Sequence, residues 1–221
     1  MFSFGLVTVS YIVATILFIL SLGGLSNPET ARKGNFYGIL GMSIAILATV
    51  LGPKVTETGY IPLLIAILIG GSIGVFAAKK VKMTEMPELV ALMHSLVGLA
   101  AVLVGYANYL DPQDALSGAE KTIHEVEIYI GILIGAVTFS GSVIAFGKLS
   151  GKITGKPVLL PARHLFNLGL LLASLYVGAR FLQVDNHADG LLALYVMTGI
   201  ALLFGIHMAV SYTHLTLPTI L

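Results

Sequence analysis

One ionisable side chain, His94, lies inside an apolar segment of membrane-spanning length, Pro87 to Leu110 (PELVALMHSLVGLAAVLVGYANYL). At about 1.5 Å of rise per residue, His94 lies roughly 10 Å into a helix that starts at Pro87, too deep for its ring to extend to the interface. Ionisable groups at such depth need polar partners or water, and they mark ion paths and proton relays. Because histidine changes charge near neutral pH, we predict that His94 carries protons. The competing interpretation is a structural histidine that is hydrogen-bonded to a neighbouring helix.

Three more polar residues could serve the same chemistry. Ser142 lies near the end of a later apolar segment, at a depth similar to that of His94; Glu127 opens that segment, and Asn108 lies across the loop before it. A hydroxyl at this depth can hold water between helices or bond back to its own helix. An acidic residue at a helix start can take up protons, or it can simply stabilise the positive end of the helix dipole. We predict a proton pathway formed by His94, Ser142, Glu127 and Asn108.

The remaining polar residues indicate no further chemistry. Asn167 and His207 are expected near the membrane interface. The histidines show no metal-ligand spacing, and the sequence holds no Ser/His/Asp arrangement, no H-E-x-x-H motif and no P-loop. We therefore expect no metal, no bound cofactor and no catalytic residue of the soluble-enzyme kind in this chain.

The elements that position these residues are apolar helices. The chain is 57% hydrophobic and only 10% charged, whereas soluble domains carry about 25% charged residues. Its net charge of +1 gives no basic excess that would favour binding to nucleic acid. The composition predicts an all-α integral membrane protein, a bundle of about seven transmembrane helices in a hydrocarbon core about 30 Å thick. The predicted spans are Phe4–Leu22, Phe36–Gly52, Tyr60–Ala78, Glu88–Leu110, Glu127–Gly147, His164–Leu182 and Gly190–Ala209.

Basic residues are distributed unevenly around the connections between these spans. Lys and Arg number two, three and four at the first, third and fifth connections, but one each around the second, fourth and sixth. Cytoplasmic loops carry the excess of Lys and Arg in membrane proteins. The distribution predicts that the N-terminus lies outside and that the seventh helix ends in the cytoplasm.

Small residues recur four apart on several spans, which lets helix backbones approach closely in lipid. This spacing predicts tight helix packing at Gly41/Ala45, Gly70/Gly74/Ala78, Gly131/Gly135 and Gly169/Ala173.

Three long runs closely resemble the membrane part of proton-translocating NAD(P) transhydrogenase beta subunits. They are MTEMPELVALMHSLVGLAAVLVGYANYL (Met83–Leu110), GAVTFSGSVIAFGKLSGKITGKPVLLPARH (Gly135–His164) and GLVTVSYIVATILFILSLGGLSNPETARKGN (Gly5–Asn35). The resemblance covers about residues 1 to 209. It matches His94 to the channel histidine of the family, and less firmly it matches Ser142 and Glu127 to polar positions of the next helix.

The resemblance implies a translocase of a bacterial inner membrane that couples hydride transfer between NADH and NADP⁺ to proton movement. In that family the hydride chemistry takes place in soluble NAD(H)- and NADP(H)-binding domains, so this segment alone is not expected to transfer hydride. The implied partners are the alpha subunit with its NAD(H)-binding domain, the NADP(H)-binding domain of the beta subunit, the lipid bilayer and a second protomer. Nucleic acid is not an expected partner. Without the resemblance, the residues would also allow a small-molecule or ion transporter or a structural membrane subunit.

The end of the sequence departs from the family pattern. Family members continue into further membrane helices and an NADP-binding domain, whereas residues 210–221 (VSYTHLTLPTIL) are polar and β-branched and do not resemble them. We therefore expect an incomplete transmembrane domain over residues 1–209, followed by a tail that is an artefact.

Overall fold

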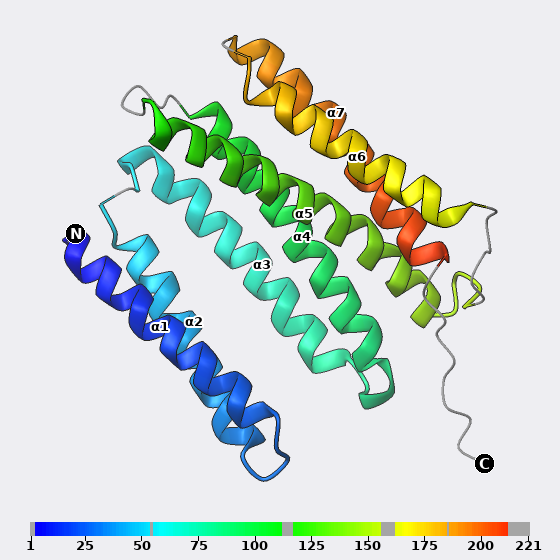
Figure 1. The fold of residues 1–221 in the computed structure, drawn as a ribbon. Helices are drawn as coiled ribbons and strands as arrows, with labels where there is room; N and C mark the ends of the chain where they lie inside the picture. The colour runs from blue at the N-terminus through cyan, green and yellow to red at the C-terminus, as the bar shows by residue number, and fades with distance from the viewer. Residues whose placement is uncertain (1–2, 54, 112–116, 156–161, 185, 212–221) are drawn as a thin grey trace. The chain divides into compact units, whose positions relative to one another are not determined.

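The computed structural model describes residues 3–53, 55–111, 117–155, 162–184 and 186–211. Within these ranges the chain forms helices and no strand (Figure 1). The elements are α1 (Phe4–Leu25), α2 (Ala31–Val50), η1 (Glu57–Gly59), α3 (Tyr60–Lys80), η2 (Met83–Glu85), α4 (Met86–Leu110), α5 (Ala119–Leu149), α6 (Arg163–Phe181) and α7 (His187–Ser211).

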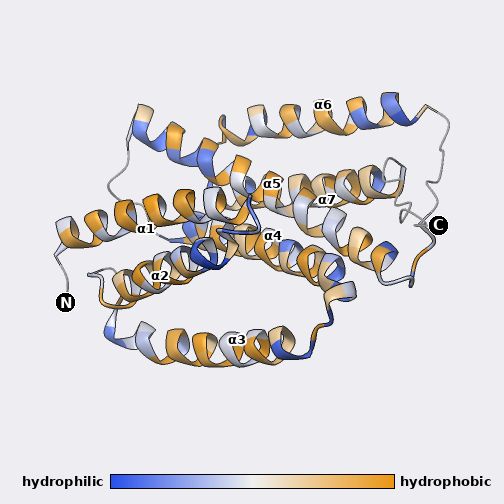
Figure 2. Ribbon diagram, turned by 90° about the horizontal axis from the view of Figure 1, so that it is seen from below, coloured by the Kyte–Doolittle hydropathy of each residue, from blue (hydrophilic) through white to orange (hydrophobic). Residues whose placement is uncertain are grey.

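Seven helices of the described chain are long and apolar enough to cross a membrane. Figure 2 shows hydrophobic residues along the lengths of these helices and hydrophilic residues mainly near their ends and in the connections. The prediction of an all-α, multi-pass membrane protein is therefore confirmed. The sidedness of the two termini stays a prediction, as does the domain boundary at residue 209, because most of the tail lies outside the described residues.

Helix α5 begins about two turns before the predicted span, at Ala119 rather than at Glu127. Hydropathy marks only the part of a helix that lies in hydrocarbon, whereas the helix itself continues into the polar region. The extra turns carry an ion pair between Lys121 Nζ and Glu125 Oε1 at 3.6 Å, an i,i+4 spacing that supports helix. As a result His124 and Glu127 lie on one helix, a single turn apart.

Contacts divide the chain into two units, Met1–Lys80 and Val81–Leu221, and in the first unit α1 and α2 pack as a hairpin. A Cβ atom on Gly34 would lie 2.7 Å from the backbone nitrogen of Leu25, and one on Gly41 would lie 3.1 Å from the carbonyl oxygen of Ala14. The hydroxyls of Tyr11 and Thr49 lie 2.9 Å apart across the same pair. The predicted close packing is confirmed at Gly41.

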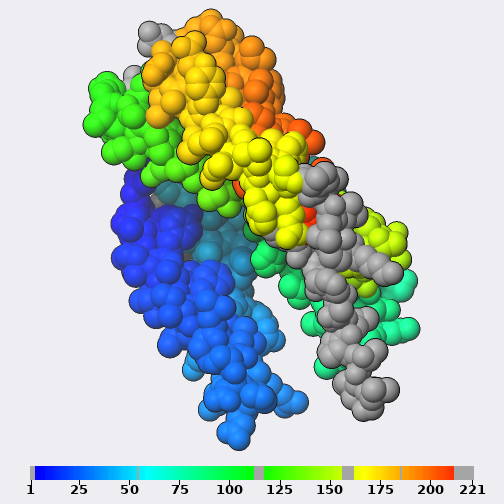
Figure 3. Space-filling view, turned by 45° about the vertical axis from the view of Figure 1, so that its right-hand side comes forward, coloured from blue at the N-terminus to red at the C-terminus, as the bar shows by residue number. Residues whose placement is uncertain are grey.

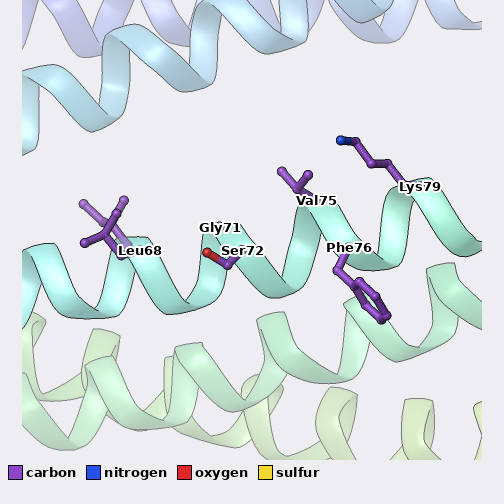
Figure 4. Close-up of a pocket in the computed structure, with 7 residues that line it drawn as sticks. Leu68, Gly71, Ser72, Val75, Phe76 and Lys79 are labelled. Atoms are coloured by element: carbon purple, nitrogen blue, oxygen red, sulfur yellow. The ribbon is translucent and has the colours of Figure 1, made fainter.

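Helix α3 has no buried residue, and a Cβ atom on Gly70 or Gly74 would meet nothing within 4 Å. The predicted packing role of these glycines is therefore not seen within this unit. A shallow hollow along α3 is lined by residues of that helix alone. In Figure 4, Val75 and Lys79 point to one side of the helix and Phe76 points to the other, so the residues do not converge on a site.

The second unit is built around α5, which packs against α4 on one side and α7 on another, while α6 packs against α7. Figure 3 shows α6 (yellow) and α7 (orange) side by side. The core contains apolar residues from all four helices: Val102, Ile128, Tyr129, Ile132, Ala136, Phe181, Leu194, Met197 and Ala201.

Two tyrosines join these helices through hydrogen bonds. The Tyr129 hydroxyl donates to the carbonyl oxygen of Ser174 on α6 at 2.6 Å, and the hydroxyls of Tyr106 on α4 and Thr198 on α7 lie 2.7 Å apart. Since apolar contact alone gives helices no advantage over lipid, such bonds help to fix which helix faces which.

Candidate functional site

Glycines set the distance and register between α4 and α5. A Cβ atom on Gly98 would lie 2.6 Å from the backbone nitrogen of Phe139 and 2.7 Å from the carbonyl oxygen of Gly135. His94 lies one turn before Gly98 on α4. Because the two helices are antiparallel, the residues of α5 at the same level are Gly141 and Ser142. His94 and Ser142 therefore lie at similar depth, although their side chains form no hydrogen bond with each other.

A groove of about 250 Å³ opens between the other ends of these two helices. Its polar lining is Asn108 from α4 and His124 and Glu127 from α5, and the rest is Ala101, Val104, Gly105, Ile128 and Gly131. A Cβ atom on Gly131 would meet nothing within 4 Å, so the missing side chain leaves the groove open. The structure thus brings together two predicted pathway residues, Asn108 and Glu127.

The groove also contains His124, which the predicted pathway omitted. The sequence carried a signal for it, because His124 and Glu127 are three residues apart and such residues share a helix face. The signal was easy to miss because His124 precedes the apolar segment and looked like part of a loop.

His94 lies on the face of α4 that lines the groove. Ala101 and Asn108 follow it at intervals close to whole helical turns, which places Ala101 roughly 10 Å farther along the same face. The His94 side chain is exposed, and among the described residues it has no hydrogen-bond partner. An imidazole on an outward helix face needs water or a polar partner in a membrane.

Ser142 is half-buried on α5, and no hydrogen bond ties its hydroxyl to the described residues. The nearby Ser140 behaves differently, because its hydroxyl bonds back to the carbonyl oxygen of Ala136 at 3.0 Å. The hydroxyl of Ser142 is thus not committed to its own helix.

A second polar cluster joins α5, α6 and α7 at the opposite end of the unit. His207, only 8% exposed, donates from Nδ1 to Asn167 Oδ1 at 2.6 Å, and its Nε2 lies 3.4 Å from the Ser211 hydroxyl. Lys148 Nζ donates to the carbonyl oxygen of Ala209 at 2.7 Å, where a cation stabilises the negative end of a helix. The sequence placed Asn167 and His207 separately near the interface, and nothing in it indicated that they pair.

Replacing Asn167 by leucine should destabilise the protein by about 1–3 kcal/mol, because His207 Nδ1 would stay buried without its partner. Thermal unfolding in detergent measures the change. Leu168→Ala, at an exposed neighbouring position, is the control and should cause a smaller loss. An unchanged unfolding midpoint for Asn167→Leu would show that the hydrogen bond contributes nothing.

The part of the chain that the structure describes holds no group of three or more His, Cys, Asp or Glu side chains that could bind a metal ion. The polar groups in the groove are the amide of Asn108, the imidazole of His124 and the carboxyl group of Glu127.

Comparisons with known proteins point in one direction. The model of the family described as NAD(P) transhydrogenase beta subunit matches residues 7–221, a range that includes the predicted tail. An NAD(P) transhydrogenase subunit beta of Rhodospirillum rubrum is 56% identical over 158 residues, which are 70% of this chain and 34% of that protein. A second sequence of the same name, from a specified strain of that species, matches to the same extent. The chain spans about a third of the length of these curated relatives.

Proposed function

Because this chain belongs to the NAD(P) transhydrogenase beta-subunit family, we propose that its helices form the membrane domain through which the complete enzyme moves protons. The observation that supports this most directly is the groove between α4 and α5, where Asn108 and Glu127 line one opening.

The proposed path runs from the groove along the shared face of α4 to His94. Glu127 and Asn108 hold water at the outer opening, and water carries the proton past Ala101 to the imidazole. Ser142, at the level of His94 on α5, offers a hydroxyl that can accept a hydrogen bond from the water and donate one in turn. His94 then passes the proton toward the cytoplasmic side.

Coupling requires that His94 be accessible from one side at a time. Moving one elementary charge through 100 mV requires about 2.3 kcal/mol, which is within the range of a difference in nucleotide-binding free energy. The soluble domains of the complete enzyme would favour one of two arrangements of these helices, because differential contacts alone can shift such an equilibrium.

The complete enzyme catalyses hydride transfer between NADH and NADP⁺, with both nucleotides bound outside this segment. Its partners are the alpha subunit with its NAD(H)-binding domain, the NADP(H)-binding domain and a second protomer. The location is a bacterial inner membrane, with odd-numbered connections in the cytoplasm because they carry most of the Lys and Arg residues.

Glu127→Gln tests the outer part of this path in the full-length beta subunit, assembled with its alpha subunit in liposomes. We expect proton flux and hydride transfer to fall together by about tenfold, since the amide cannot take up a proton. Glu120→Gln, at an exposed position in the first turn of α5, is the matched control and should keep the native rates. Native coupled rates in Glu127→Gln would exclude the groove as the access route.

A further inference from the structure

We propose that His124 is the proton-carrying residue at the outer opening of the groove, where it takes up the proton that reaches His94. The inference rests on the proposed function and adds a histidine to the path. The observation that supports the inference is the position of His124 Nε2.

This nitrogen is buried, and among the described residues it has no hydrogen-bond partner. Such an atom costs folding free energy unless water or a ligand satisfies it, so its retention needs an explanation. The residue lines an open groove of about 250 Å³, which has room for several water molecules at about 30 Å³ each. Because Nε2 itself is buried beside this groove, the ring must turn toward the groove before a groove water can become the partner of His124 Nε2.

The charged side chains around His124 are mostly acidic. The only cation of the described first turns of α5, Lys121, is paired with Glu125, which leaves Glu127 as an uncompensated carboxylate in the groove. Across the groove, the end of α4 contributes Asn108, and its antiparallel register brings Asp111 to the level of His124. The titratable and charged side chains at these helix ends are Glu120, Lys121, Glu125 and Glu127 on α5, Tyr106, Tyr109 and Asp111 at the end of α4, and His187 and Asp189 at the start of α7.

Imidazole suits the step because it has two nitrogen atoms. Hydronium at the opening gives its proton to one nitrogen and leaves as water. The resulting imidazolium gives the proton on its other nitrogen to the next water toward His94, which leaves a neutral ring in the other tautomer. Reorientation of the ring or proton exchange then restores the starting tautomer. Atoms and charge balance in this sequence, and no other reactant is needed.

His124→Ala in the full-length beta subunit, assembled with its alpha subunit in liposomes, tests the proposal by chemical rescue. We expect coupled proton flux to fall at least tenfold and to recover when imidazole is added on the outer side, because the open groove admits the free base. His187→Ala is the matched control: its ring Nε2 lies 2.9 Å from the carbonyl oxygen of Tyr109, a structural contact, so imidazole should change nothing.

If His124→Ala does not fold, His124→Gln replaces it, since an amide can hydrogen-bond the water but cannot carry a proton; the loss of flux should be the same. Native flux in either variant overturns the proposal, and so does a loss in a folded His124→Ala protein that imidazole does not restore. Native flux in His124→Ala, together with a loss of flux in His94→Ala, would reject the role of His124 but not the proposed function. Native flux in both would also reject the proposed function.

Discussion

His94→Ala should stop proton flux and hydride transfer together in the full-length beta subunit assembled with its alpha subunit. Alanine leaves no group on this face of α4 that can bind a proton between the groove and the far end of the helix. Loss of a positioned proton-transfer group typically lowers the rate by about 10²–10⁴-fold. Because the two activities are coupled, hydride transfer should fall by the same factor as proton flux.

The measurement follows proton flux in liposomes and, in parallel, the reduction of NADP⁺ by NADH. Val97→Ala is the matched control, because Val97 is also exposed on α4, one turn away, and carries no ionisable group. His94 is exposed, so its replacement should leave the thermal unfolding midpoint nearly unchanged. A His94→Ala protein that pumps and transfers hydride at native, coupled rates would show that His94 does not carry the proton, and the proposed relay would be wrong.

Gly98→Ala should have the second large effect, on folding and activity together. Its new Cβ atom would lie 2.6 Å from the backbone nitrogen of Phe139 and 2.7 Å from the carbonyl oxygen of Gly135, so the two helix backbones must move apart. Overpacking of this kind costs about 1–3 kcal/mol even where side chains can adjust, and here the obstacle is backbone. The movement would also change the groove that the same two helices form.

Gly131→Ala is the matched control for this experiment. Gly131 lies on α5 in the lining of the groove, but a Cβ atom there would meet nothing within 4 Å. Alanine also favours helix over glycine by up to about 1 kcal/mol. Thermal unfolding in detergent should therefore show a large fall for Gly98→Ala and no fall for Gly131→Ala; equal midpoints would mean that α4 and α5 do not approach each other as closely as described.

Not every glycine pattern in the sequence had the same meaning. Gly41 and Gly135 occupy close helix crossings, as their spacing predicted, whereas Gly70, Gly131 and Gly169 face open space within their units. The four-residue spacing records only that small residues share a helix face. Whether another helix lies against that face depends on how the helix is rotated about its axis, and the spacing does not specify that rotation.

The sequence by itself determined the seven apolar helices, because transfer of a segment into hydrocarbon depends on the sum of about 20 neighbouring side chains. It also determined the resemblance to the transhydrogenase beta subunits and singled out His94, since one ionisable residue in an apolar run is visible without a structure. Only the tertiary structure decided that Asn108, His124 and Glu127 share a groove, that Asn167 pairs with His207, and that the His94 side chain is exposed within its unit. Such contacts depend on helix rotation and register. The helices are apolar on nearly every face, so no stripe in the sequence marked which side meets a neighbour.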